Sequence, residues 1–248
     1  MQISLKHKTA IITGASRGIG KEIALKFGSL GASVAVNYLH RKQEAEQICD
    51  QITDMGGNAI PVQADMRDIA AIERMVDMAI NTFGSLDILV NNAGIMICKP
   101  IQDLTEQEFD TLFASNVKGV FFACQQAAKK MTDGGTIINI SSSATKLMMP
   151  TYGAYAATKG AVEQITKILA KELGPRQIQV NAISPGPVDT ELFRQGKSDG
   201  LVNSLADMAA LGRIGTPQDI ANAAALLASD DAGWITGQNI CVNGGFVS

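Results

Sequence analysis

The sequence lacks three features: a membrane-spanning segment, a signal peptide for export and a set of cysteines spaced to bind a metal ion. No hydrophobic run approaches the roughly 18 apolar residues that a membrane-spanning helix requires. Residues 1–8 do not have the charged and then apolar arrangement of a signal peptide. The four cysteines are widely separated and show no metal-ligand spacing. We therefore expect no membrane span, no metal site and a reducing, cytoplasmic setting.

Positive charge is also sparse along the chain. The formal net charge is −3, and the longest basic stretches are residues 129–130 and 40–42. A nucleic-acid-binding surface normally needs a clustered basic patch, so we expect no nucleic-acid partner. The 248 residues contain no recognisable linker. A single domain, 1–248, with a sizeable core is therefore expected.

Short apolar segments alternate with helix-length segments along almost the whole chain. Several apolar segments are nearly continuously hydrophobic, which is typical of parallel strands buried on both faces. The predicted strands are residues 9–13, 33–37, 59–63, 86–90, 136–140, 179–183 and 239–242. The pattern predicts an α/β fold with a doubly wound, parallel, seven-stranded sheet and helices on both faces. It breaks at about residues 188–216, where Gly196 and Gly200 would allow a substrate lid to close.

A glycine-rich loop, Thr13-Gly-Ala-Ser-Arg-Gly-Ile-Gly20, follows the first predicted strand and opens a helix. Glycines allow a tight turn and a close approach of the backbone to a phosphate, which then faces the N-terminus of the helix. A purely structural turn is the alternative, but the position at the first strand-to-helix junction favours a dinucleotide site. The residues expected to bind it are Gly14, Ser16, Arg17, Gly18, Ile19 and Gly20.

The end of the second predicted strand indicates which dinucleotide is bound. An acidic residue there would bind the ribose hydroxyls of NAD, but residues 36–42 contain no carboxylate before Glu44. Arg17 and either His40 or Arg41 can instead pair with a 2′-phosphate. We therefore expect NADP(H) as the cofactor. The cofactor-binding residues expected in this segment are Asn37, Tyr38 and His40.

Tyr155 and Lys159 stand four residues apart near the start of a predicted helix, and Ser142 precedes them at the end of a predicted strand. Residues i and i+4 share one face of a helix, so the phenol and the ammonium can converge. A free tyrosine titrates near pH ~10, and an adjacent ammonium stabilises the phenolate and lowers that pKa. The spacing predicts a proton-transfer pair, with the Ser142 hydroxyl holding a carbonyl oxygen.

Asn116 interrupts an apolar stripe at helical spacing. The stripe consists of Phe109, Leu112, Phe113, Val120 and Cys124. A polar amide in this position must find hydrogen-bond partners. Asn116 is therefore either a functional residue or a core asparagine bonded to a neighbouring helix or strand.

Together these motifs resemble those of the short-chain dehydrogenase/reductase family. The resemblance covers essentially the whole chain and depends on a set of motifs in the family's order and spacing. The set is the loop of residues 13–20, Asn91-Asn-Ala-Gly94, Asn116, Ser142, Tyr155, Lys159, Pro185-Gly186 and Val242-Asn-Gly-Gly245. It implies a Rossmann fold and hydride transfer between a nicotinamide and a carbonyl or secondary alcohol.

The resemblance also implies a role for each residue of the candidate site. Tyr155 would be the general acid in carbonyl reduction, while Lys159 would lower its pKa and bind the nicotinamide ribose. Ser142 would polarise the carbonyl, and Asn116 would hold a water that joins Lys159 to solvent. The remaining cofactor contacts would be Asp65 and Met66 at the adenine, with Asn91, Asn92, Ala93, Gly94, Pro185, Gly186, Val188 and Thr190.

An apolar, adaptable substrate cavity is expected beside these residues. The expected substrate contacts are Ser142, Met148, Tyr155, Leu192 and Phe193, with Ile95, Met96, Leu147, Met149 and Tyr152 as further candidates for the wall. The methionines could equally pack in the core or against another subunit. The resemblance implies a homotetramer, formed through helices around residues 105–130 and 155–174 and the C-terminal strand.

The expected function is NADP(H)-dependent reduction of an apolar ketone or aldehyde. A 3-oxoacyl-[acyl-carrier-protein] reductase is one alternative, which would need a basic docking surface such as Lys129, Lys130 and Arg176. A sugar or polyol dehydrogenase is another. A dinucleotide-binding regulator without turnover is a third, but it would not need the Ser142, Tyr155 and Lys159 set.

Overall fold

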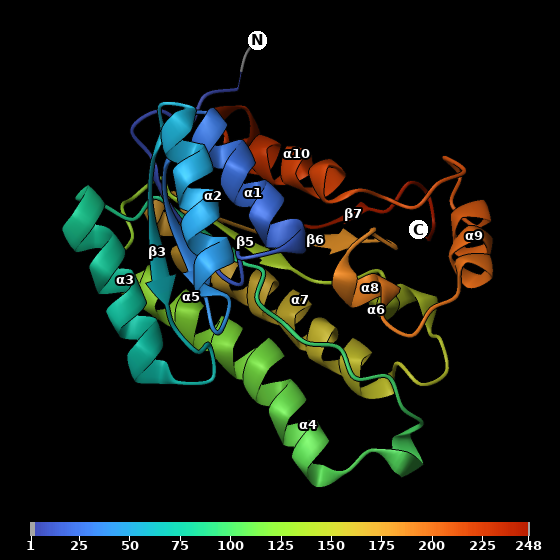
Figure 1. Cartoon of the computed structure of the whole chain (residues 1–248). Helices are drawn as coiled ribbons and strands as arrows, with labels where there is room; N and C mark the ends of the chain where they lie inside the picture. Colours follow the sequence, from blue (N-terminus) through green and yellow to red (C-terminus); the bar gives the residue numbers. More distant parts are fainter. Residues whose placement is uncertain (1–2, 248) are drawn as a thin grey trace.

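Within residues 3–247, which the computed structural model describes, seven strands form one parallel sheet in the order β3-β2-β1-β4-β5-β6-β7 (Figure 1). The strands are β1 (Thr9–Ile12), β2 (Ser33–Tyr38), β3 (Asn58–Gln63), β4 (Ile88–Asn91), β5 (Thr136–Ile140), β6 (Gln179–Pro185) and β7 (Asn239–Val242). The predicted doubly wound parallel sheet is confirmed. Its central strands β1, β4 and β5 are buried along their whole length, as their apolar sequences require.

The strand order reverses between β1 and β4. The chain runs outward from β1 to β2 and β3, and then returns to place β4 on the other side of β1. The loops after β1 and β4 therefore diverge at the carboxyl edge of the sheet. Ligands of such sheets bind at this reversal point.

Helices cover both faces of the sheet (Figure 1). One hydrophobic cluster joins the sheet to α1, α2 and α10, and a second joins it to α3, α5 and α7. Helix α4 continues into α5 through a π-helical segment, Ala114–Lys118. The helices are α1 (Gly18–Ser29), α2 (Lys42–Asp54), α3 (Ile69–Phe83), α4 (Glu106–Phe113), α5 (Gly119–Lys130), α6 (Ala144–Leu147), α7 (Gly153–Leu173), α8 (Glu191–Arg194), α9 (Asp199–Asp207) and α10 (Pro217–Ala228), with 3₁₀ turns at Ile101–Asp103, Gly174–Arg176 and Asp230–Ala232.

The segment between β6 and α10 contains the short helices α8 and α9. Figure 1 shows both at one end of the molecule, away from α3. A third, small cluster of Leu205, Ala209 and Phe246 packs with Leu147 and Phe193. This segment is therefore attached to the body of the protein by few buried side chains. Among the described residues, no helix combines the length and the apolar character that crossing a membrane demands.

Candidate active site

The glycine-rich loop between β1 and α1 is bonded to the loop that follows β4. Thr13 Oγ1 accepts hydrogen bonds from the backbone N–H groups of Asn92 and Ala93, both at 2.9 Å. The Asn92 side chain donates to the carbonyl oxygens of Thr13 and Gly14, at 2.9 and 3.1 Å. These four bonds fix the two loops against each other where the strand order reverses.

Two glycines allow this close approach. Gly14 has φ +62°, and a Cβ at this position would lie 2.9 Å from Ala93 Cα. A Cβ at Gly20 would lie 2.5 Å from Asn92 Nδ2. Any larger residue would push the two loops apart, so glycine is required at both positions.

Asn37, near the end of β2, supports the glycine-rich loop from within the protein. Its Oδ1 accepts a hydrogen bond from Gly14 N at 2.9 Å, and its amide donates to the carbonyl oxygens of Val62 and Ala64 at 3.2 and 3.1 Å. Its side-chain donors are thus committed to the protein. Asn37 positions the loop, although it also lies in the wall of the cavity described below.

The N-terminus of α1 is open to an anion. Arg17 occupies the N-cap without a side-chain capping bond, and the first turn of the helix contains no acidic residue. Free N–H groups and the positive end of the helix dipole therefore face the loop. This donor set fits the pyrophosphate of a dinucleotide.

A cavity of about 490 Å³, here called the nucleotide cavity, opens over this helix end. Its walls come from the glycine-rich loop, the end of β2, the segment after β3, the loop after β4 and α8. The predicted cofactor residues that line it are Gly14, Ser16, Arg17, Gly18, Ile19, Asn37, His40, Asp65, Met66, Asn92, Ala93, Gly94 and Thr190. Asp65 is paired with Arg67 at 2.7 Å, and this contact holds the pKa of the Asp65 carboxyl below its usual value.

Three residues predicted to bind the cofactor lie away from the cavity walls. Tyr38 is 6% exposed in the core between β2 and its covering helices, because consecutive strand residues point to opposite faces and Asn37 takes the loop side. Asn91 is 2% exposed, and its amide donates to Asn139 Oδ1 at 2.8 Å within the sheet. Gly20 is buried where α1 packs against Asn92 and the glycine-rich loop, outside the cavity wall. The prediction of ligand contacts for these three is corrected accordingly.

Tyr155 and Lys159 lie in the first two turns of α7 and face β5. Lys159 is 5% exposed, and its Nζ donates to the carbonyl oxygen of Ile140 at 2.8 Å. The same nitrogen lies 5.8 Å from the centre of the Tyr155 ring. Both side chains line one cavity, so the predicted convergence on a single helix face is found.

The expected lowering of the tyrosine pKa is not found. Burial raises the pKa of Tyr155 to about 12, although the interaction of its hydroxyl with Ser142 acts in the opposite direction. Burial also lowers the pKa of Lys159 to about 8. Desolvation disfavours the charged form of both groups, and it is the largest cause of each shift.

Ser142 is the only residue of the run Ser141-Ser142-Ser143 whose hydroxyl faces Tyr155. Ser141 Oγ donates to Glu163 at 3.0 Å, and Ser143 Oγ donates to the carbonyl oxygen of Ser184 at 3.3 Å. Ser142 Oγ accepts a bond from Ala144 N at 3.1 Å and interacts with the Tyr155 hydroxyl. Ser141 and Ser143 line the substrate cavity described below. Ser142 is not in the cavity wall, and it is connected to the cavity by its interaction with the Tyr155 hydroxyl.

Asn116 lies fully buried in the π-helical segment between α4 and α5. Its Oδ1 accepts from Ile95 N at 2.9 Å, while its amide donates to the carbonyl oxygen of Ile95 at 2.8 Å and to Thr158 Oγ1 at 3.2 Å. Both amide hydrogens are therefore used within the protein. The side chain joins the loop after β4 to α7. This agrees with the interpretation of Asn116 as a core asparagine whose amide is hydrogen-bonded to neighbouring elements.

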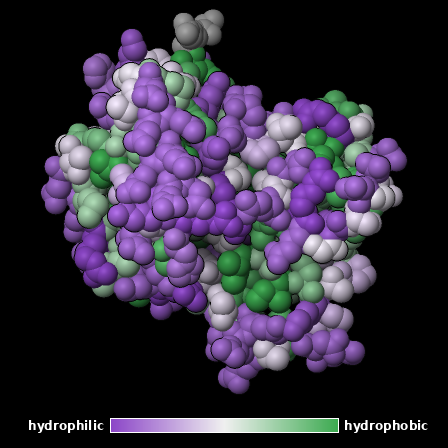
Figure 2. All heavy atoms as spheres, viewed as in Figure 1, coloured by the Kyte–Doolittle hydropathy of each residue, from purple (hydrophilic) through white to green (hydrophobic). Residues whose placement is uncertain are grey.

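A second cavity of about 320 Å³, here called the substrate cavity, lies against Tyr155. Figure 2 shows hydrophobic residues gathered below α8, where Figure 1 places the segment that follows β4. The predicted residues in its wall are Ile95, Met96, Leu147, Met149, Tyr152, Tyr155, Lys159, Pro185, Gly186, Val188, Leu192 and Phe193. Ile19, Asn92, Gly94, Ile95, Thr190 and Leu192 belong to the walls of both cavities.

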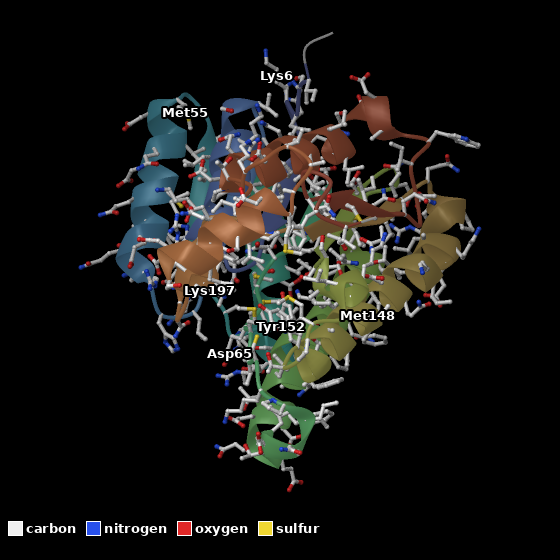
Figure 3. All side chains as sticks on the ribbon, turned by 90° about the vertical axis from the view of Figure 1, so that its right-hand side faces the viewer. Lys6, Met55, Asp65, Met148, Tyr152 and Lys197 are labelled. Carbon is white, nitrogen blue, oxygen red and sulfur yellow. The ribbon has the colours of Figure 1, made fainter. Side chains whose placement is uncertain are left out.

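Met148 was predicted to contact the substrate, but it points into solvent. It is 85% exposed and has φ +52°, so the turn directs its side chain away from the cavity that Leu147 and Met149 line. In Figure 3, Tyr152 lies between Met148 and Lys197. Met148 is therefore removed from the predicted substrate contacts.

Three charged residues near the site were not predicted from the sequence. Glu163 accepts hydrogen bonds from Ser141 and from Thr145, at 3.0 and 2.8 Å, and so braces the loop on both sides of Ser142. Lys197 lies in the substrate cavity, with its Nζ 5.0 Å from the centre of the Phe193 ring. Glu191 lies in the nucleotide cavity. No local sequence pattern marks Glu163 or Glu191, because their partners come from distant segments.

Three comparisons with known proteins agree with this geometry. A family model described as enoyl-(acyl carrier protein) reductase matches residues 14–247. An uncharacterized oxidoreductase of Methylorubrum extorquens is 45% identical over 243 residues, 97% of this chain and 98% of that protein. A NADPH-dependent aldehyde reductase-like protein, chloroplastic, of Arabidopsis thaliana is 40% identical over 259 residues, 99% of this chain and 96% of that one. A short chain dehydrogenase from Burkholderia cenocepacia, solved in complex with NADP, has a TM-score of 0.93 at 34% identity and covers 98% of each chain. This chain belongs to the short-chain dehydrogenase/reductase family of oxidoreductases.

Proposed function

We propose that this protein reduces an apolar ketone or aldehyde with NADPH, and that Tyr155 donates the proton. The observation that carries this proposal is the position of Tyr155 and Lys159 in the wall of an apolar cavity that shares residues with the nucleotide cavity. When bound, the nicotinamide supplies the hydride. The protein's own residues orient the carbonyl and deliver the proton.

The protonation of Tyr155 supports the reductive direction. With a pKa of about 12, the phenol carries its proton at neutral pH and can donate it to a carbonyl oxygen held by Ser142 and Tyr155. Lys159, with a pKa of about 8, is mostly cationic at neutral pH and stabilises the phenolate that remains. Alcohol oxidation would begin from the phenolate, which is rare at this pH.

The choice of NADP(H) is supported by the charges around the nucleotide cavity. Arg17, His40 and Arg41 lie in its wall, and no carboxylate follows directly from β2. Guanidinium groups bind phosphate oxygens through charge-assisted hydrogen bonds. We expect kcat/KM to favour NADPH over NADH by well over tenfold, and a preference for NADH would reject this part of the proposal.

The alternative of an acyl-carrier-protein substrate has less support. Lys130 is paired with Asp77 at 2.5 Å, and Arg176 is paired with Asp133 at 2.7 Å. The charges of Lys130 and Arg176 are thus compensated within the protein, and of the three expected docking residues only Lys129, which is bonded to Gln125, has no acidic partner. A sugar or polyol is also disfavoured, because the substrate cavity is lined mainly by apolar side chains.

The proposal is tested by following NADPH absorbance with a panel of ketones and aldehydes. Tyr155→Phe is expected to lose about 10²- to 10⁴-fold in kcat, since general acid catalysis contributes a factor of this size, while NADPH binding stays within twofold. Tyr152→Phe is the matched control, because its ring lies 6.3 Å from that of Tyr155 in the same cavity. NADPH binding without turnover of any carbonyl by the wild type would indicate a regulator instead.

We also propose that the protein is a cytoplasmic homotetramer. Large apolar side chains are exposed on α4, α5 and α7, including Phe109, Phe121 and Ile168. Exposed apolar patches of this kind mark contacts between proteins.

All four cysteines are free, which agrees with a reducing compartment.

A further inference from the structure

Glu191, the first residue of α8, forms ion pairs with two of the three arginines in the wall of the nucleotide cavity, Arg17 and Arg41. Its Oε2 lies 2.5 Å from Arg17 Nη1 in the glycine-rich loop and 3.1 Å from Arg41 Nη2 after β2. These partners are 174 and 150 residues away in the sequence. A single carboxylate oxygen therefore lies where two guanidinium groups converge.

The same two arginines are those that the proposed use of NADP(H) assigns to the 2′-phosphate. Carboxylate and phosphate oxygens compete for the same guanidinium donors, because both are anionic acceptors of the same N–H groups. We propose that Glu191 is an internal counter-anion of the phosphate-binding arginines, and that a 2′-phosphate must displace it. The inference rests on the proposed function, and it makes Glu191 a determinant of nucleotide affinity.

The exposure of the three side chains makes such an exchange feasible. Arg17, Arg41 and Glu191 have side-chain exposures of 48%, 40% and 61%, so water screens the pairs. Exposed pairs contribute little to stability. A phosphate carries nearly two negative charges at neutral pH and offers three acceptor oxygens, so it binds the two guanidinium groups better than one carboxylate does.

Glu44 provides an internal comparison. It lies 3.7 Å from Arg41 Nη1 on the neighbouring turn of α2, but it contacts only this arginine and is absent from the cavity wall. Removing the Glu44 charge changes the local electrostatics without opening the bridge between Arg17 and Arg41. A general effect of negative charge and a specific effect of Glu191 can thus be separated.

The test is calorimetric binding of 2′,5′-ADP and 5′-AMP, which share the adenosine and the 5′-phosphate and differ only in the 2′-phosphate. Glu191→Gln is expected to bind 2′,5′-ADP roughly fivefold more tightly than the wild type, because two exposed ion pairs no longer need to be broken. Binding of 5′-AMP is expected to change by less than twofold. Glu44→Gln is expected to change neither affinity by more than twofold.

The possible results distinguish this inference from the proposed cofactor preference. A wild type that binds 2′,5′-ADP no better than 5′-AMP would reject the NADP(H) proposal and this inference together. A wild type that prefers 2′,5′-ADP, combined with an unchanged or weakened Glu191→Gln variant, would reject only the role of Glu191. Equal tightening in Glu191→Gln and Glu44→Gln would likewise reject it in favour of general electrostatics.

Discussion

At the scale of single residues, the catalytic pair shows how burial governs charge. Tyr155 and Lys159 share one face of α7, as their spacing predicts. Burial nevertheless raises the pKa of Tyr155 and lowers the pKa of Lys159, so that the neutral form of each is favoured. Spacing determines which side chains meet, whereas desolvation depends on the surrounding fold. The sequence therefore predicts the pair but not the direction of the tyrosine pKa.

The lowered pKa of Lys159 predicts a pH-dependent contribution to stability. Between the folded pKa of about 8 and the unfolded value near 10.5, the unfolded chain binds more protons, so the lysine destabilises the fold less as pH rises. Relative to Lys159→Met, the wild type should gain roughly 2 kcal/mol of unfolding free energy between pH 7.5 and pH 10. Urea denaturation of both proteins without cofactor measures this difference. A difference that does not vary with pH would contradict the lowered pKa.

At the scale of elements, strands are predicted closely and turns are not. Each predicted strand overlaps its observed counterpart, because buried parallel strands need continuous apolar runs. Tyr38 was misplaced since β2 extends one residue beyond its predicted end, and the alternation of side chains then turns it into the core. Met148 was misplaced because its left-handed backbone cannot be inferred from its neighbours.

The segment of α8 and α9 is expected to respond to mutation differently from the sheet. Leu205 belongs to a small cluster with Ala209 and Phe246, whereas Leu89 lies fully buried in the central strand β4. Leu89→Ala should cost about 2 to 5 kcal/mol of global unfolding free energy. Leu205→Ala should cost less than about 1 kcal/mol globally, because this segment can open locally, and should raise the KM for the carbonyl. Urea unfolding and steady-state kinetics would separate the two, and equal global losses would show that the segment unfolds together with the sheet.

At the scale of the whole molecule, several large apolar side chains lie exposed on the surface, outside the hydrophobic core. Phe121 on α5 is 50% exposed, and Phe109 on the adjoining α4 is 44% exposed and stacks on Phe113. No sequence pattern separates such residues from core residues, because both recur at helical spacing. Their exposure supports the proposed assembly of several subunits.

Phe121→Glu is therefore expected to reduce the mass of the protein in solution. A buried, unpaired carboxylate at a subunit contact is strongly unfavourable, so the tetramer should dissociate to smaller species. Met55→Glu is the matched control, because Met55 is 51% exposed at the end of α2 on another part of the protein. Light scattering after size-exclusion chromatography measures both variants. A tetramer that persists in Phe121→Glu would exclude α5 from the contact, and a monomeric wild type would refute the assembly.

Helix α7 has a further consequence for the temperature dependence of the reaction. It is 21 residues long, and Val162, Thr166 and Leu169 are buried beyond the turns that carry Tyr155 and Lys159. The two reacting groups are therefore immobilised when the chain folds and not at each turnover. Little orientational entropy is left to be lost on reaching the transition state. The activation barrier of the chemical step should accordingly be mainly enthalpic, so that its rate rises steeply with temperature until the fold itself gives way.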